Sequence, residues 1–199
     1  MPRRRYDQYC AAARALDTVG DRWTLLIVRE LLAGPRRYTD LHADLPGVST
    51  DVLASRLKDM ERDGLTTRRK LPPPGAVSVY ELTPRGLELL PVLTALADWG
   101  APALADRRPT DALRAHWFAI PLARRLEDLG ANVVEVRLDE GVFHVRTDNG
   151  RPLYGDGPAD RPDATLTLDT GTCIAISEGR ISVKDGVREG LVVLEIPPV

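Results

Sequence analysis

The sequence predicts an α+β protein with two domains, residues 1–105 and 106–199. The first half consists mainly of segments with helical spacing of apolar residues, interrupted by one pair of alternating segments. The second half has a helical segment, several alternating segments and two short helical segments near its end. Between them lies APALADRRP (101–109), whose Pro, Arg and Asp content is typical of a linker. A length of 199 residues accommodates two small domains.

The first domain is organised around a helix that begins after Ser49. Pro46-Gly47 is a strong turn signal, and Ser49 can accept a hydrogen bond from a free backbone N–H as an N-cap. The apolar face of this helix, expected to be buried, consists of Leu53, Leu57 and Met60. The opposite face is polar and carries Asp51, Ser55, Lys58 and Arg62. A shorter helix from Thr39 to Leu45 precedes it, so the pair predicts a helix-turn-helix, with an ordinary helical hairpin as the alternative.

The segment after the helix pair favours the helix-turn-helix. LTTRRK (65–70) and VSVYEL (77–82) are predicted strands joined by a Pro/Gly loop, which together form a basic hairpin of the kind called a wing. Residues 1–105 hold 15 Lys+Arg and 13 Asp+Glu, a net charge of +2, whereas residues 106–199 hold 12 and 16, a net charge of −4. Any surface that binds nucleic acid must therefore be a local cluster of cations, because the domain as a whole is not strongly basic.

A helix from Thr83 to about Trp99 is apolar on most of its faces. Such a helix must be buried all round, and a domain this small has little interior to cover it. We therefore expect a partner subunit to cover the apolar faces that the domain leaves exposed, and we expect Pro91 to kink the helix.

No apolar run is long enough to predict a membrane span, and no secretory signal is present, so we expect a cytoplasmic protein without a membrane partner.

These stretches resemble the HxlR-type winged-helix transcriptional regulators of bacteria. The resemblance rests on Cys10 with ARALDTVGDRWTLLIVRELLAGPRRYTDL (13–41), LPGVSTDVLASRLKDMERDGL (45–65) and VYELTPRG (79–86). It implies a homodimer that binds a roughly palindromic double-stranded DNA operator, with the first and last helices of the domain forming the dimer contacts. The helix from Ser49 would enter the major groove, as in other helix-turn-helix proteins.

Candidate DNA contacts follow from this docking. Base edges would be contacted by Thr50, Asp51 and Ser55 at the start of the helix, beside its cap Ser49. Phosphates would be contacted by Arg36, Arg37, Arg56, Lys58, Arg68, Arg69 and Lys70. Asp51 departs from the resemblance, because members often carry a basic or amide residue there. An acid repels phosphate but suits the helix dipole and can accept from a cytosine amino group.

Cys10 has two interpretations. Some relatives use an N-terminal cysteine at this position to sense oxidants or electrophiles, and a thiol near a helix N-terminus has a lowered pKa. The alternative is a small residue packed in the first helix. A DNA-binding redox sensor that switches through Cys10 is therefore one rival function.

The second domain is predicted to contain a helix over 110–129, a strand over 132–138, a return strand through Phe143 and Val145, and a short strand over 151–154. A strand ATLTLD (164–169), two short helices over about 170–177 and 182–189, and a last strand over 191–196 follow. Helices packed on one face of a sheet give an α+β domain. DATLTLDTGTCIAISEGRISVKDGVREGLVVLE (163–195) resembles the sterol carrier protein type 2-like fold. That resemblance implies an apolar tunnel for a hydrophobic small molecule, with candidate walls Phe143, Ile174, Ile176, Ile181, Val187 and Leu191. Each of these residues is alternatively plain core.

Several function classes are not supported. His42, His116 and His144 have no other ligand at metal-binding spacing, and no nucleophile, phosphate-loop or dinucleotide motif occurs, so neither an enzyme nor a metal or cofactor is expected. Two cysteines are too few for a disulfide framework. The predicted function is a dimeric DNA-binding transcriptional regulator controlled by a hydrophobic ligand. A second rival is a lipid or hydrophobic-metabolite carrier whose winged helix serves only to dimerise.

Overall fold

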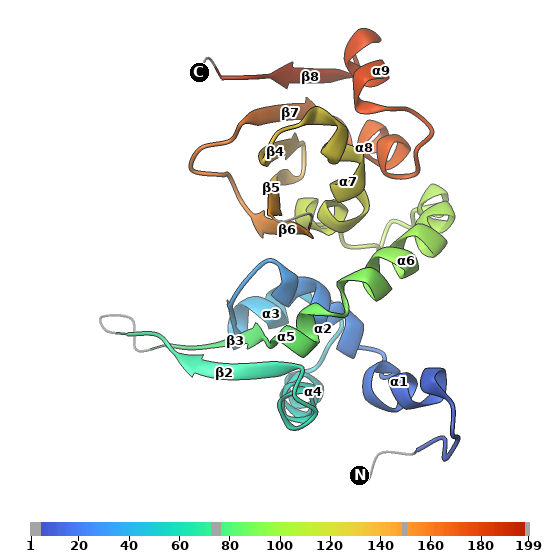
Figure 1. Cartoon of the computed structure of the whole chain (residues 1–199), viewed down its shortest axis with the longest axis vertical. Coiled ribbons are helices and arrows are strands. Elements are labelled where there is room, and N and C mark those ends of the chain that lie inside the picture. Colours follow the sequence, from blue (N-terminus) through green and yellow to red (C-terminus); the bar gives the residue numbers. More distant parts are fainter. Residues whose placement is uncertain (1–4, 73–76, 149–150, 198–199) are drawn as a thin grey trace. The chain divides into compact units, whose positions relative to one another are not determined.

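The computed structural model describes residues 5–72, 77–148 and 151–197 (Figure 1). Residues 73–76 of the predicted wing loop, and Asn149-Gly150, where the sequence predicts a hairpin turn, lie outside the described residues. The chain divides into two compact units, residues 1–89 and 90–199. Most of the helix predicted before the linker, from Leu90 onward, belongs to the second unit. The domain boundary between residues 105 and 106 stays a prediction.

The first unit contains helices α1 (Ala11–Val19), α2 (Thr24–Leu32), α3 (Tyr38–Asp44), α4 (Thr50–Arg62) and α5 (Pro84–Leu87), with strands β1 (Arg36–Arg37), β2 (Thr66–Lys70) and β3 (Ser78–Leu82). The strands form an antiparallel sheet in the order β1-β3-β2. The β2–β3 hairpin extends from the helices in Figure 1 and is the predicted wing. The two-residue strand β1 was not predicted from the sequence, because it is too short to show alternation.

The core of the first unit confirms the predicted burial pattern of α4. Leu53, Leu57 and Met60 are almost completely buried. They share the interior with residues of α2, α3 and the following turn: Ile27, Leu41 and Leu45. The Ser49 side chain accepts a hydrogen bond from the N–H of Val52 at 3.4 Å, as its predicted capping role requires.

The predicted helix over 83–99 is interrupted. Thr83 caps α5 by accepting from the N–H of Gly86 at 3.1 Å, and its hydroxyl donates to the carbonyl of Gly64 at 2.6 Å. α6 then begins at Leu90 and ends at Gly100. Pro91 lacks an N–H and would clash with the carbonyl four residues earlier, which explains the break between α5 and α6.

One further property of this segment was not predicted. The helical stretch Pro84–Asp106, which includes a 3₁₀ helix over Ala101–Asp106, is long and apolar enough to cross a membrane by length and composition. A single such helix is weak evidence for a membrane span.

The second unit contains a five-stranded sheet. Its strands are β4 (Val133–Leu138), β5 (Gly141–Asp148), β6 (Arg151–Asp156), β7 (Ala164–Leu168) and β8 (Val192–Glu195), in the order β6-β5-β4-β7-β8. Only β4, β5 and β6 form a meander, since β7 returns to pair parallel with β4. This pairing places β4 at the centre of the sheet, which no local pattern could reveal.

Helices α7 (Ala119–Leu126), α8 (Thr170–Ser177) and α9 (Val183–Arg188) accompany this sheet. α7 contacts β5, β6 and α8, while α9 packs against β8. The helix predicted over 110–129 is wrong in its first part. Residues 111–114 are irregular, a 3₁₀ helix covers Ala115–Phe118, and α7 is followed by a second 3₁₀ turn, Glu127–Leu129. Pro121 is accommodated in the first turn of α7, where its missing N–H costs nothing.

Candidate nucleic-acid interface

The polar face of α4 is exposed from its first turn onward. Thr50, Asp51, Ser55 and Lys58 are all exposed, whereas the apolar residues between them are buried. Lys58 makes no hydrogen bond or ion pair within the part of the chain that the structure describes. The helix therefore presents hydroxyl, carboxylate and ammonium groups to solvent on a rigid element.

The start of α4 is fixed by the preceding helix. The Tyr38 hydroxyl donates a hydrogen bond to the carbonyl of Thr50 at 2.7 Å, and its ring stacks on His42 with 6.4 Å between centroids. Gly47, in the turn between α3 and α4, has a φ of 86°, a conformation that side chains disfavour. Sequence reasoning missed Tyr38, because a contact twelve residues apart leaves no local signal.

Arg56 differs from the other predicted phosphate contacts. Its guanidinium forms ion pairs with Asp59 at 2.6 Å and Asp21 at 3.4 Å, and only 17% of the side chain is exposed. The structure thus shows Arg56 tying the region before α2 to α4. A phosphate contact by Arg56 stays a prediction and would compete with these two carboxylates.

The wing carries its cations on β2. The Arg68 guanidinium lies over the Tyr80 ring, 5.8 Å from its centroid, and Arg69 Nε donates to Glu81 Oε2 at 3.0 Å. Lys70, at the end of the strand, is exposed. Residues of the neighbouring strand β3 therefore contact two of the three cations, Arg68 and Arg69.

Strand β1 contributes two further basic residues. Arg36 and Arg37 pair with Tyr80 and Val79 along the edge of β3 that lies opposite to β2. Arg37 is exposed and its backbone N–H donates to Asp40 at 3.3 Å, while Arg36 is half-buried. The predicted basic residues of 36–37 and 68–70 thus belong to the same three-stranded sheet.

Comparison with known proteins identifies the family of this unit. The family model described as HxlR-like helix-turn-helix matches residues 18–107. The HTH-type transcriptional regulator YvaP of Bacillus subtilis is 37% identical over 86 residues, which cover 43% of this chain and 80% of YvaP. The chain belongs to the HxlR family. The predicted resemblance of the first half is confirmed. The matched relatives are named as HTH-type transcriptional regulators, not enzymes.

A second relative is the HTH-type transcriptional regulator YodB of Bacillus subtilis, 33% identical over 85 residues, which cover 43% of this chain and 76% of YodB. The solved reduced form of YodB has a TM-score of 0.43 and 31% identity, covering 47% of this chain and 92% of that one. The HxlR match reaches residue 107, so it includes α6.

The two cysteines lie in opposite environments. Cys10 is the exposed N-cap residue of α1, and the backbone N–H groups of Ala13 and Ala12 lower the pKa of its thiol, although its sulfur makes no capping hydrogen bond. Cys173 is fully buried in α8, and desolvation raises the pKa of its thiol to about 12. Cys10 has the environment of a reactive thiol, and Cys173 that of an inert one.

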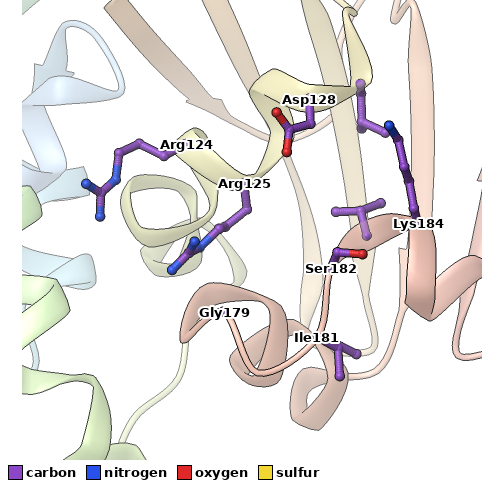
Figure 2. Close-up of a pocket in the computed structure, with 9 residues that line it drawn as sticks. Arg124, Arg125, Asp128, Gly179, Ile181, Ser182 and Lys184 are labelled. Atoms are coloured by element: carbon purple, nitrogen blue, oxygen red, sulfur yellow. The ribbon is translucent and has the colours of Figure 1, made fainter.

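The six candidate tunnel residues do not share one environment. Phe143 and Ile176 are fully buried, Ile174 and Ile181 are half-buried, and Val187 and Leu191 are 37% and 45% exposed. Of these six, Ile181 alone lines the described pocket between the end of α7 and the segment that leads from α8 into α9 (Figure 2). A tunnel with these walls stays a prediction, and core packing accounts for the burial of Phe143 and Ile176.

Proposed function

We propose that this HxlR regulator binds a specific operator as a homodimer in the cytoplasm, with α4 in the major groove and the β2–β3 wing on the phosphate backbone. The observation that carries the proposal is the exposed polar face of α4 above a fully buried apolar face. Thr50, Asp51 and Ser55 would read base edges, and Lys58, Arg37 and the wing cations would contact phosphates.

Exposed apolar residues support the homodimer. On α6, Val92, Leu96 and Trp99 are 47%, 46% and 83% exposed. On α1, Leu16 is 49% exposed. Apolar side chains exposed in this number along one helix are typical of a surface that a partner covers. A second copy of the chain would bury them, which also accounts for the apolar character of Pro84–Asp106 without a membrane.

We further propose that the second domain, predicted to begin at residue 106, controls DNA binding through a small molecule. The order of a helix, a three-stranded meander, a returning strand, two short helices and a last strand supports the sterol carrier protein type 2-like interpretation. A hydrophobic ligand is the expectation that this resemblance carries.

Binding to DNA from the protein's own upstream region at several salt concentrations tests the DNA proposal. Because Lys58 is exposed and unpaired among the described residues, Lys58→Ala should lower the slope of log affinity against log salt by about one. Arg69→Ala should lower the slope by less than this, since Glu81 already neutralises part of its charge. Arg188→Ala in the second unit is the matched control, removes the same charge and should leave the slope unchanged. Equal slopes for Lys58→Ala and the control would refute the assignment.

A DNA-binding redox sensor is the second candidate, favoured by the exposure of Cys10 and its lowered pKa. Oxidant should then release the wild-type protein from DNA, and Cys10→Ser should abolish that release. If Cys10→Ser still responds to oxidant, Cys10 is not the switch. The hydrophobic-carrier alternative predicts instead that no fragment of the upstream region binds.

A further inference from the structure

The segment that leads from α1 into α2 lies beside the first half of α4. The Arg56 guanidinium of α4 forms an ion pair with Asp21 at 3.4 Å. The tip of the Trp23 ring lies next to the turn before α4, since a Cβ placed on Gly47 would be 4.0 Å from Trp23 Cη2. Arg22 stands between these two anchored residues in the sequence. It is therefore held near the end of α4 that we propose enters the major groove.

The Arg22 side chain carries a charge that is available to a ligand. Arg22 is exposed, and its Cζ lies 5.3 Å from the centroid of the Trp23 ring. The side chain forms no hydrogen bond or ion pair with any residue that the structure describes. The neighbouring Asp21 carboxylate is occupied by Arg56 and by the N–H of Trp23 at 3.2 Å. The aromatic face restricts the guanidinium without neutralising its charge.

Arg22 and the wing border opposite flanks of α4. Glu61 lies on the flank next to β3, because its charge, after burial, helps to raise the pKa of Tyr80. Arg56 lies five residues earlier, about 140° around the helix from Glu61. Figure 1 likewise shows the wing extending to one side of α4, and α1, which this segment follows, on the other side. The outward polar face of α4 lies between the two flanks.

A helix in the major groove has a phosphate backbone on each side. The groove is roughly 12 Å wide and a helix with its side chains is roughly 10–12 Å across, so cations on both flanks can reach phosphates. The predicted contacts Arg37 and Lys70 lie on the flank of the wing sheet. Of the predicted phosphate contacts, only Arg56 lies on the opposite flank, and its guanidinium is paired with Asp21 and Asp59. That flank therefore needs another cation to contact its backbone.

We propose that Arg22 contacts a DNA phosphate on the side of the major groove away from the wing. Trp23 positions the guanidinium, and the Asp21–Arg56 ion pair fixes the segment to α4. The helix is then held in the groove from both flanks. The assignment rests on the proposed function, because it requires α4 to lie in the major groove.

Fluorescence anisotropy with a duplex from the protein's own upstream region, at several salt concentrations, tests the assignment. Arg22→Gln removes one phosphate contact and should lower the slope of log affinity against log salt by about one. Arg22→Lys keeps the charge and should keep the slope of the wild type. Arg188→Gln, in the second unit and paired with Asp185, is the control and should leave the slope unchanged.

Ethylation interference locates the contact on the DNA. Ethylated phosphates on both sides of the groove should weaken binding of the wild type. Arg22→Gln should abolish the interference on one side, and Lys70→Gln, on the wing, should abolish it on the other. Both side chains are exposed, so thermal unfolding of these variants should match the wild type. If Arg22→Gln is unfolded, Arg22→Ala decides in its place.

Two results on DNA that the wild type binds would overturn the assignment and leave the proposed function standing. One is a wild-type slope in Arg22→Gln. The other is a slope in Arg22→Lys as low as that of Arg22→Gln, because the lost quantity would then not be the charge. If the wild type binds neither the upstream duplex nor a random duplex of the same length, the proposed function is refuted and the assignment with it.

Discussion

Among the residues that the structure describes, two unpaired cations of each unit lie on surfaces of different shape. In the first unit, Lys58 and Lys70 project from the outer face of a helix and from the end of a wing strand. In the second unit, Arg125 and Lys184 line one hollow. A long polyanion such as DNA requires charges spread along a surface, whereas a small anion requires donors that converge on one point. Lining one hollow does not by itself make Arg125 and Lys184 converge, so the contrast lies in where the backbone places similar residue types.

Other cations of both units are already paired with carboxylates. Arg56 is tied to Asp21 and Asp59, and Arg69 to Glu81, within the first unit. Arg124 is tied to Asp98 in the second. Except for Arg56 with Asp59 within α4, these pairings cross between elements. A count of Lys and Arg therefore overstates the charge that is available to a ligand in either unit.

The largest expected difference between the units is in cysteine reactivity. The pKa of Cys10 is below its ordinary value of 9.0 and that of Cys173 is raised to about 12, so their thiolate fractions at neutral pH differ by about a thousandfold or more. Iodoacetamide should alkylate Cys10 at a pH where free cysteine reacts slowly and leave Cys173 unmodified until the protein unfolds. Mass spectrometry of the labelled peptides measures both rates. Comparable rates in the folded protein would contradict these environments.

The second largest effect concerns the core of the second unit. Phe143 is completely buried in β5, so Phe143→Ala should lower the free energy of unfolding by about 3–5 kcal/mol. Urea denaturation followed by circular dichroism measures the loss, and hydrogen exchange in β5 localises it. Val193→Ala in β8, at a position that is 56% exposed, is the control and should change little. A small loss at Phe143 would instead favour a cavity there, as the predicted tunnel requires.

The helix N-caps of the two units should differ by a smaller amount in the free energy of unfolding that their removal costs. The Asp169 carboxylate accepts from the N–H of Thr172 at 2.9 Å and from its hydroxyl at 2.6 Å, whereas Ser49 accepts one bond of 3.4 Å. Asp169→Ala should therefore cost about 1–2 kcal/mol and Ser49→Ala about 0.5 kcal/mol. Thermal unfolding of the two variants measures this difference.

The pH dependence separates the two caps further. Hydrogen bonds from Thr172 lower the pKa of Asp169 below its ordinary value of 3.8, so its stabilisation is present above that value and is lost as the pH falls through the folded pKa. The cost of Asp169→Ala should accordingly shrink in acid, while that of Ser49→Ala should stay constant. If the stability costs of both substitutions stay constant with pH, the charge of Asp169 contributes nothing to stability.

A further small effect is expected on the face of α4 that we propose reads DNA. Ser55 is exposed and bears no net charge, so Ser55→Ala should leave the salt slope unchanged and relax the preference at one base pair by about 1 kcal/mol. Binding to a set of operators with single substitutions measures it. A uniform loss across all operators would place Ser55 on the phosphate backbone instead.

The sequence by itself determined the local elements. The cap at Ser49 and the apolar spacing of Leu53, Leu57 and Met60 predicted α4 because these interactions lie within one helix. The β-prone basic segment 65–70, the Pro/Gly loop and the alternation over 77–82 predicted the wing. The short helices α8 and α9 were predicted within about a residue of their bounds. The residue motifs also determined the HxlR family of the first half.

Only the tertiary structure decided which residues meet across elements. Tyr38 fixes the start of α4, β7 pairs with β4, and Arg125 and Lys184 line one pocket, although each pair lies far apart in sequence. The candidate tunnel residues were chosen by type, and packing divided them into core, half-buried and exposed positions. Local patterns record which face of an element is apolar, but the partner of that face is determined by the path of the whole chain.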